Sequence, residues 1–507
     1  MVPWLTPSLC AGLRAAFQRS GFDVDGVPAL LGPSAHAALS RDEPVPARLA
    51  TAGAGPLGTL IRLFLLGDTE PEDAVAEALA PVEVGDAVAA KLLRAVPGGI
   101  AAALDVRPHG EAGWWVVSDQ DTRPGGKRSA LAADHVLGVG QASLTLAAAT
   151  VRRPAARVLD LGTGCGVQAL HAADHAGELV ATDVNQRALA LAAATFALSD
   201  VPVELRAGAW LEPVASDTFD HVVCNPPFVT GPPRVRHTYR DSGLAGDTVA
   251  ARLVGAIPRH LNDGGVAQLL ACWLHVKGQD WPERVTSWLP GARAGGDGPD
   301  DGAVDAWFVQ REVADPALYV GTWLRDSGLD PASPAARRES EEWLAWFEAN
   351  QVEGVGFGFI TLRRTGSGNP TVLCEDLLEA PAGLTGDDVS GWLDRVAWLR
   401  EHPSDDEVLD TRMRLAPGVL LEEVSSAGPD GWTPVVATVR SGENAGWRHE
   451  VDSPAAALLA GCQGALSLGE LVELLAVAHD RNTDELVASS LPAVRELMRH
   501  GLLIPSE

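Results

Sequence analysis

The spacing of hydrophobic and polar positions changes along the chain, and each change predicts a type of element. In the first 130 residues, apolar positions recur at helical spacing and then alternate, as they do in strands. The helical stretches are residues 57–66, 71–79 and a segment that ends near residue 95, and the strand-like stretches are residues 100–106 and 114–118. This order predicts an N-terminal helical or winged-helix-like cap over residues 1–130.

From about residue 131, short apolar runs alternate with helical patterns. The predicted strands are residues 157–161, 179–183, 203–206, 221–224, 266–271, 307–313 and 356–362, with helices at residues 186–198, 247–261 and 335–350. Alternation at these lengths favours an open, mostly parallel sheet with helices on both faces. Residues 131–365 are therefore predicted to form a Rossmann-like α/β domain with a seven-stranded sheet.

A loop rich in Gly, Pro and Asp at residues 290–305 precedes the last two of these strands, and a third part begins after about residue 366. Residues 366–507 are predicted to be an acidic α+β module that ends in a winged-helix-like unit of three helices. These helices are residues 453–459, 467–478 and 483–500. Ser467 and Glu470 have capping-box spacing, and Gly501 stands where a helix stops. The last helix has two arginines, Arg495 and Arg499, against three acids at positions 484, 485 and 496, which favours packing or contact with a partner protein over reading DNA.

Composition narrows the class of protein. The chain has 507 residues, 46% of them hydrophobic and 21% charged, as is typical of globular domains. The formal net charge is −28, and most of it falls in residues 291–507, which carry −21. This balance disfavours a protein that coats nucleic acid or an anionic membrane.

Cysteine usage and hydropathy indicate the compartment. The six cysteines form no CxxC pair and no Cys/His cluster with zinc spacing, so reduced thiols and no metal site are predicted. The sequence has no run of about 18 apolar residues, so no membrane span is predicted. The first residues lack the basic region and the apolar run of a secretory signal. We expect a cytoplasmic protein.

The first stretch that carries chemistry is a glycine-rich turn. A strand ends at Asp160, glycines follow at positions 162, 164 and 166, and a helix then begins. Glycine is needed there because side chains would keep a ligand away from the backbone. Asp183 follows at the end of the next strand, where it can accept bonds from the two hydroxyls of a ribose. These features predict a nucleoside-containing ligand and leave NAD possible, although GxGxG in place of GxGxxG favours a ligand without a pyrophosphate.

A second motif, Asn225-Pro226-Pro227-Phe228, ends the fourth predicted strand. The two prolines stiffen the turn and hold the Asn225 side chain and the Pro226 carbonyl at the edge where open α/β sheets bind ligands. Two acceptors can take both hydrogen bonds of an –NH2 group, and Phe228 can lie against a flat group that carries it. This arrangement suits attack by a weakly nucleophilic planar nitrogen on a cationic methyl donor, without a strong base.

Together these motifs resemble the class I S-adenosylmethionine-dependent methyltransferases, specifically the "small domain" N-methyltransferases. That group includes the release-factor glutamine N5-methyltransferases and the ribosomal RNA guanine-N2 methyltransferases. The resemblance covers about residues 131–365 and implies S-adenosyl-L-methionine as cofactor. Residues 138–145, which include Ser143, resemble the segment that closes over the cofactor in the guanine enzymes. An acid at the position of Asp247 caps the following helix in the glutamine enzymes.

The resemblance also assigns residues. The residues that would contact the methyl acceptor and carry the reaction are Asn225, Pro226, Pro227 and Phe228. The residues that would bind the cofactor are Asp160, Gly162, Thr163, Gly164, Gly166, Asp183, Val184, Ala209, Trp210, Asn225 and Ser143. Further substrate contacts would come from Arg236, Tyr239 and Arg240, in a basic loop that could equally be a surface loop paired with nearby acids.

One position departs from the family pattern. Relatives usually have an acid after the third strand that binds the adenine amine, and here the chain reads Gly208-Ala209-Trp210. Backbone groups, or packing on Ala209 and Trp210, would then hold the adenine.

The acceptor is predicted to be a planar nitrogen, narrowly an exocyclic amine of a nucleobase in RNA. The alternative acceptors are a glutamine side chain in a protein and a small-molecule amine. A further alternative is that the protein is a catalytically silent binding scaffold with a methyltransferase fold.

Overall fold

A computed structural model describes residues 5–120, 132–235, 241, 243–290, 303–326, 329–366, 369–378, 383–429, 431–442 and 446–506. The chain divides into two compact units. The first comprises residues 1–147, 153–308 and 313–366, and the second comprises residues 148–152, 309–312 and 367–507. Among the described residues, no helix is long and apolar enough to cross a membrane.

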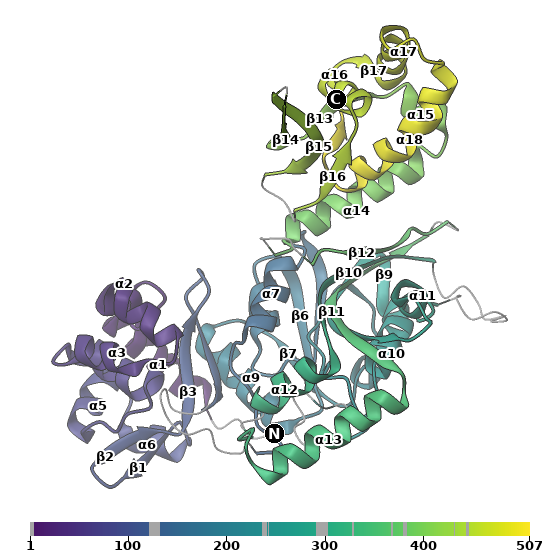
Figure 1. Ribbon diagram of the computed structural model, residues 1–507. Coiled ribbons are helices and arrows are strands. Elements are labelled where there is room, and N and C mark those ends of the chain that lie inside the picture. The colour runs from purple at the N-terminus through teal and green to yellow at the C-terminus, as the bar shows by residue number, and fades with distance from the viewer. Residues whose placement is uncertain are drawn as a thin grey trace. The chain divides into compact units, whose positions relative to one another are not determined.

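The N-terminal part of the first unit gathers several short helices beside two β-hairpins (Figure 1). The helices are α1 (Pro7–Ser20), α2 (Gly26–Ser40), α3 (Pro44–Thr51), α4 (Gly55–Leu60) with the π-helix η1 (Ile61–Leu65), α5 (Glu72–Leu79) and α6 (Val84–Ala89). The strands are β1 (Leu93–Val96), β2 (Gly99–Ala102), β3 (Leu104–His109) and β4 (Trp114–Asp119).

The prediction was wrong at the first hairpin. Residues 93–96, expected at the end of a helix, form β1 and pair with β2, and the expected strand 100–106 is divided between β2 and β3. Gly98 and Gly99 both have positive φ, at +96° and +146°, and close the β1–β2 turn. An apolar run this short does not distinguish helix from strand by its periodicity.

Polar contacts join these helices to the α/β part of the same unit. Arg14 on α1 donates to the carbonyls of Ala197 and Leu198, at 2.7 and 2.9 Å, near the end of helix α9 (Gln186–Ser199). Those carbonyls lack partners within the helix, so a cation there satisfies them. The backbone N–H of Trp115 on β4 donates to the hydroxyl of Ser199, the last residue of α9, at 3.1 Å. The helical part and α9 share one hydrophobic core.

The α/β part is built on one sheet, whose strand order is β12-β10-β11-β9-β8-β5-β6-β7. The central strand β5 is parallel to both β6 and β8, and β11 is antiparallel to β9. All seven predicted strands are present, and β12, whose residues are counted with the second unit, adds an eighth. The bounds are β5 (Ala155–Leu161), β6 (Ala176–Asp183), β7 (Glu204–Ala207), β8 (Phe219–Cys224), β9 (Leu261–Val276), β10 (Ala303–Ala314), β11 (Val352–Thr365) and β12 (Val372–Asp376).

The strand order reverses at β5, because β6 lies on one side of it and β8 on the other. Open α/β sheets bind ligands at such a point, beyond the carboxyl ends of the strands. The helices of this part are α7 (Gln141–Ala149), α8 (Val167–Ala172), α9, α10 (Thr248–Ala256), α11 (Trp281–Thr286), α12 (Pro316–Asp326) and α13 (Pro334–Ala349), with 3-10 turns η2 (Glu212–Val214) and η3 (Ile257–His260).

The second unit combines helices with two small sheets, ordered β17-β13-β18 and β14-β15-β16. Its capping box at Ser467 and Glu470 is present, and Gly501 has a φ of +70° after the last helix, so both predictions are confirmed. Its elements are α14 (Gly386–Glu401), α15 (Asp405–Leu409), β13 (Arg412–Leu415), β14 (Val419–Gly428), β15 (Gly431–Ser441), β16 (Arg448–Val451), α16 (Ser453–Gly461), β17 (Gln463–Ser467), α17 (Leu468–Ala478), α18 (Thr483–Arg499) and β18 (Leu503–Pro505).

Candidate functional site

The glycine turn after β5 is open toward solvent or a ligand. Gly162 and Gly164 have φ values of +79° and +56°, and a Cβ atom added at either position would meet no other atom within 4 Å. Gly166 differs, because a Cβ there would lie 2.8 Å from the ring of Phe196. The first two glycines therefore form a cradle of bare backbone, and the third allows the turn to pack on α9.

The neighbouring strand β6 holds this turn in place. The backbone N–H groups of Gly162 and Thr163 both donate to the carbonyl of Thr182, each at 2.9 Å. The N–H of Gly164 donates to the Asp183 carboxylate at 3.0 Å. The turn and the end of β6 thus form one hydrogen-bonded unit at the edge of the sheet.

Asp160 lies beneath the turn and is 2% exposed. Its Oδ2 accepts hydrogen bonds from the Thr163 hydroxyl at 2.7 Å and from the Ala169 N–H at 3.1 Å, whereas Oδ1 is buried without a partner among the described residues. Burial raises the pKa of this carboxyl to about 6, against the lowering effect of its hydrogen bonds. A donor or cation of a ligand is the natural partner for Oδ1.

Asp183 and the residues around it form the other side of the cradle. The second Asp183 oxygen accepts from the Asn185 N–H at 2.8 Å, and burial raises the pKa of the carboxyl. Val184, the next residue, is 62% exposed, which leaves an apolar surface beside the carboxylate. The N–H of Gly208 donates to the Asp183 carbonyl at 3.1 Å, and Trp210 follows with a φ of +51°, which is unusual for a bulky residue.

Asn225 follows β8 directly and lies close to α7. Its Nδ2 donates to the Ser143 hydroxyl at 3.1 Å, and the Ser143 carbonyl accepts from Gln168 Nε2 at 2.8 Å. Asn225 Oδ1 is buried and has no hydrogen-bond partner among the described residues. The structure therefore brings together Asn225 and Ser143, which lie far apart in the sequence, and leaves the amide oxygen available.

A small pocket follows the Asn-Pro-Pro-Phe turn. Pro226, Pro227 and Phe228 line one side of it, and Gly246, Asp247 and Cys272 line another. The Phe228 ring contacts Trp323 and Phe357, with centroid distances of 5.9 and 5.4 Å. These aromatic contacts fix the ring at the pocket wall.

The basic loop is described only in part. Arg236, Tyr239 and Arg240 lie outside the described residues. Arg234, at the start of the loop, forms an ion pair with Glu342 on α13. This pair matches the interpretation of the loop as a surface segment whose arginines meet nearby acids.

Asp247 has a structural role, as the resemblance implied, but not as a side-chain cap. It occupies the N-cap position of α10, and its side chain makes no capping hydrogen bond. Its carboxylate accepts instead from the Leu274 N–H at 3.0 Å and from two nitrogens of Arg284, at 2.6 and 2.8 Å. A bidentate guanidinium competes well for a buried carboxylate, and the side chain ties α10 and α11 to β9.

The cysteines beside the site are buried. Burial raises the pKa of Cys165 to about 12 and that of Cys224 well above its ordinary value. Both thiols are therefore protonated near neutral pH, which is typical of packing residues rather than nucleophiles.

Two residues at the site were not predicted. Gln168 is a buried polar residue on α8, two positions after Gly166. A polar residue so close to the glycine turn is the signal in the sequence that points to it. Tyr319 on α12 accepts a hydrogen bond at its hydroxyl from the Thr230 N–H at 2.8 Å, and so holds the segment after Phe228. No motif pointed to Tyr319, because its partner lies on a distant part of the chain.

Comparison with known families divides the chain into three matched regions. Residues 137–272 match the family described as "Methyltransferase small domain". Residues 19–103 and 390–505 each match a domain of unknown function. The resemblance drawn from the glycine and Asn-Pro-Pro-Phe motifs is thus confirmed for the region that contains both.

Curated relatives match the same region. A release factor glutamine methyltransferase of Bordetella pertussis is 35% identical over 136 residues, which is 24% of this chain and 49% of that protein. A ribosomal RNA small subunit methyltransferase C of Idiomarina loihiensis is 34% identical over 134 residues, 26% of this chain and 35% of that protein. The chain therefore spans about half or less of the length of these relatives.

Among solved structures, a T. thermophilus 16S rRNA methyltransferase in complex with AdoMet and guanosine is 18% identical, with a TM-score of 0.25 over 36% of this chain and 44% of that chain. A SAM-dependent methyltransferase from Thiobacillus denitrificans in complex with S-adenosyl-L-homocysteine is 19% identical, with a TM-score of 0.24 over 45% of this chain and 92% of that chain.

The raised pKa of Asp160 predicts how stability depends on pH. Because the fold favours the neutral carboxyl, its contribution is fully present below the ordinary pKa of 3.8 and is lost as pH rises through about 6. Urea denaturation of the cofactor-free protein from pH 4 to pH 8 measures this. Relative to Asp160→Asn, the wild type should lose about 2–3 kcal/mol of unfolding free energy over that range. Two parallel pH profiles would show that Asp160 does not titrate as the structure implies.

Proposed function

We propose that this chain is an S-adenosylmethionine-dependent N-methyltransferase that acts on a planar –NH2 group. The observation that carries the proposal is the buried Oδ1 of Asn225, which lacks a partner among the described residues and follows β8, the strand next to β5. A buried acceptor without a partner is costly, and an N–H donor from a bound substrate would satisfy it. The glycine turn after β5 opens at the same edge of the sheet.

The residues beside the turn fit the cofactor in their chemistry. Gly162 and Gly164 leave room for close approach, and the unpartnered Asp160 Oδ1 suits a cationic group such as an α-amino group. Asp183 would accept the ribose hydroxyls, and the exposed Val184 would lie against the adenine ring. S-adenosylmethionine, when bound, would supply a methyl group activated by its sulfonium charge.

The chain's own contribution would be to position and polarise the acceptor nitrogen. Asn225 Oδ1 and the Pro226 carbonyl would accept its two hydrogen bonds, which draws the lone pair out of conjugation. The Ser143 hydroxyl, bonded to Asn225 Nδ2, would keep the amide oxygen directed at the substrate. No strong base is needed, because the nitrogen becomes acidic once it is methylated. Positioning and electrostatics would then supply the rate enhancement.

Two acceptors carry such a group. We place an exocyclic amine of a nucleobase in RNA first, because Phe228 presents an aromatic wall beside the pocket and residues 138–145 resemble the guanine-N2 enzymes. A protein glutamine is the second candidate. The ion pair between Arg234 and Glu342 favours it, because an arginine paired with an acid is less available to the phosphates of RNA. Glutamine methyltransferases among the relatives also favour it, including one from Bradyrhizobium diazoefficiens described as acting on ribosomal protein uL3.

We also propose a three-part organisation, with a cap over residues 1–130, the methyltransferase domain over residues 131–365 and an acidic module over residues 366–507. The three separate family matches, at residues 19–103, 137–272 and 390–505, support these divisions. The flanking parts would select the macromolecular substrate or contact a protein partner.

Asp183→Ala should weaken binding of S-adenosylmethionine. Removing the carboxylate leaves the ribose hydroxyls without acceptors, at about 1–3 kcal/mol, or roughly 5- to 150-fold in Kd. Isothermal titration calorimetry measures the change, with the exposed Asp174→Ala as the matched control. Equal affinity of Asp183→Ala and wild type would refute the assigned role.

Asn225→Ala should abolish most methyl transfer, and it should weaken cofactor binding much less than Asp183→Ala does. Loss of a preorganised polar contact to the reacting group lowers kcat by on the order of 10²–10³-fold. The assay is incorporation of tritiated methyl groups into lysate from a strain that lacks the protein. Asn262→Ala is the matched control, because that amide bonds Asp220 near the amino ends of the parallel strands. Full activity of Asn225→Ala would exclude the proposed mechanism.

The identity of the acceptor predicts a salt dependence. If RNA is the substrate, labelling should be sensitive to nuclease, and substrate affinity should fall steeply between about 50 and 200 mM salt as phosphate contacts are lost. Label that survives nuclease, disappears with protease and responds little to salt would instead identify a protein glutamine.

A further inference from the structure

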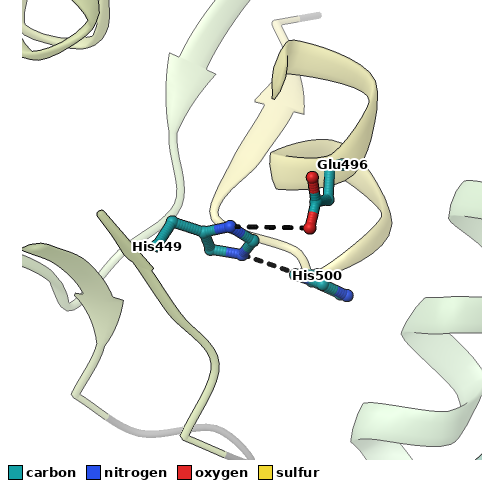
Figure 2. A group of neighbouring side chains, drawn as sticks. All are labelled: His449, Glu496 and His500. Atoms are coloured by element: carbon teal, nitrogen blue, oxygen red, sulfur yellow. Dashed lines mark hydrogen bonds and ion pairs between the residues drawn. The ribbon is translucent and has the colours of Figure 1, made fainter. Parts of the chain in front are cut away.

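Three side chains that can bind a metal ion meet in the second unit. His449 lies on β16, Glu496 lies in the last turn of α18, and His500 immediately follows that helix. One nitrogen or oxygen from each lies within 4.8 Å of the others. Figure 2 shows the His449 ring facing the other two side chains, with one nitrogen toward Glu496 and the other toward His500.

The distances describe a connected network. His449 Nε2 lies 2.8 Å from His500 Nδ1, and His449 Nδ1 lies 3.9 Å from a Glu496 oxygen. Glu496 and His500 are four residues apart at the end of α18, so both project from the same side of the chain. His449 reaches them from another element, which explains why spacing along the sequence predicted no metal site.

A second carboxylate orients one of the rings. His500 Nε2 lies 2.7 Å from Glu375 Oε1 on β12, and the Trp447 ring stacks on His500 with a centroid distance of 3.9 Å and an interplanar angle of 2°. With the Nε2 proton donated to Glu375, His500 Nδ1 carries the lone pair. A carboxylate that fixes the tautomer of a ligating histidine is the usual support of a metal site.

The three ligand side chains differ in exposure. His500 is 6% exposed, and His449 is partly buried. Glu496 is half exposed, with 54% of its side chain accessible, so it can move to complete the coordination.

We propose that His449, His500 and Glu496 form a binding site for a divalent transition-metal ion, with zinc as the preferred ion. Two imidazoles and one carboxylate are ligands that zinc accepts, and water would fill a fourth position. The ion would take the place of the proton shared by His449 Nε2 and His500 Nδ1, and the exposed Glu496 side chain, which now faces His449 Nδ1, would turn toward it. It would tie β16 to the end of α18, and Glu375 would act as the positioning residue for His500.

The test uses the full-length protein, stripped of metal with a chelator that is then removed. Zn²⁺ is titrated by calorimetry, and Co²⁺ is titrated by its visible absorption, which reports the coordination of the ion directly. His449→Gln and Glu496→Gln remove single ligands while preserving size and polarity. His479→Gln and Glu473→Gln, at exposed positions in the same unit, are the matched controls.

The expected result is one Zn²⁺ per chain, a visible Co²⁺ spectrum and a rise in thermal midpoint with added zinc. His449→Gln and Glu496→Gln should each weaken the zinc Kd at least about tenfold, and the controls should match wild type. Glu375→Gln should weaken zinc binding by about 10- to 100-fold if it orients His500. Absence of stoichiometric binding by the folded wild type, or ligand variants that bind zinc like the controls, would leave only a hydrogen-bonded histidine pair and overturn the proposal.

Discussion

Hydrogen bonds from the glycine turn to β6 are the constraint on which the rest of the site depends. The carbonyl of Thr182 accepts from two successive N–H groups of the turn, and the Asp183 carboxylate accepts from a third. These bonds hold three residues with bare or small side chains against the end of a strand. The result is a fixed concave backbone at the point where the strand order reverses, which is the position that a ligand needs in an open α/β sheet.

Buried polar atoms without partners give this edge its chemical character. Asp160 Oδ1 and Asn225 Oδ1 are both enclosed, and neither is paired among the described residues. Because both atoms are buried, the low local dielectric strengthens any hydrogen bond that a ligand makes to them. Burial also raises the pKa of Asp160 to about 6, so its ionised form is maintained at a cost in stability. Such sites are commonly found where a protein binds or reacts.

Local sequence signals predicted the parts of the structure that local chemistry determines. The strand that ends at Asp160, the glycine turn and the strand that ends at Asp183 all lie where expected, as do the capping box at Ser467 and the helix stop at Gly501. In each case the residues that determine the conformation lie within a few positions of one another, so the sequence pattern alone predicts the element.

Contacts between distant segments were not predictable in the same way. The Asp247 carboxylate binds Arg284 rather than its own helix, and Tyr319 reaches the segment after Phe228 from a helix that no pattern indicated. Ser143 was identified by family resemblance, but its bond to Asn225 appears only in the fold. The short run at residues 93–96 is a strand because it pairs with β2, and this pairing is not visible in the local pattern of the sequence.

The most direct test of the account is a crystal structure of the full chain with S-adenosylhomocysteine bound. The account predicts that the ligand lies over Gly162 and Gly164, that its ribose hydroxyls meet Asp183, and that Asn225 Oδ1 faces the sulfur from the acceptor side. A ligand bound elsewhere, or an Asn225 carboxamide turned away from the sulfur, would contradict it.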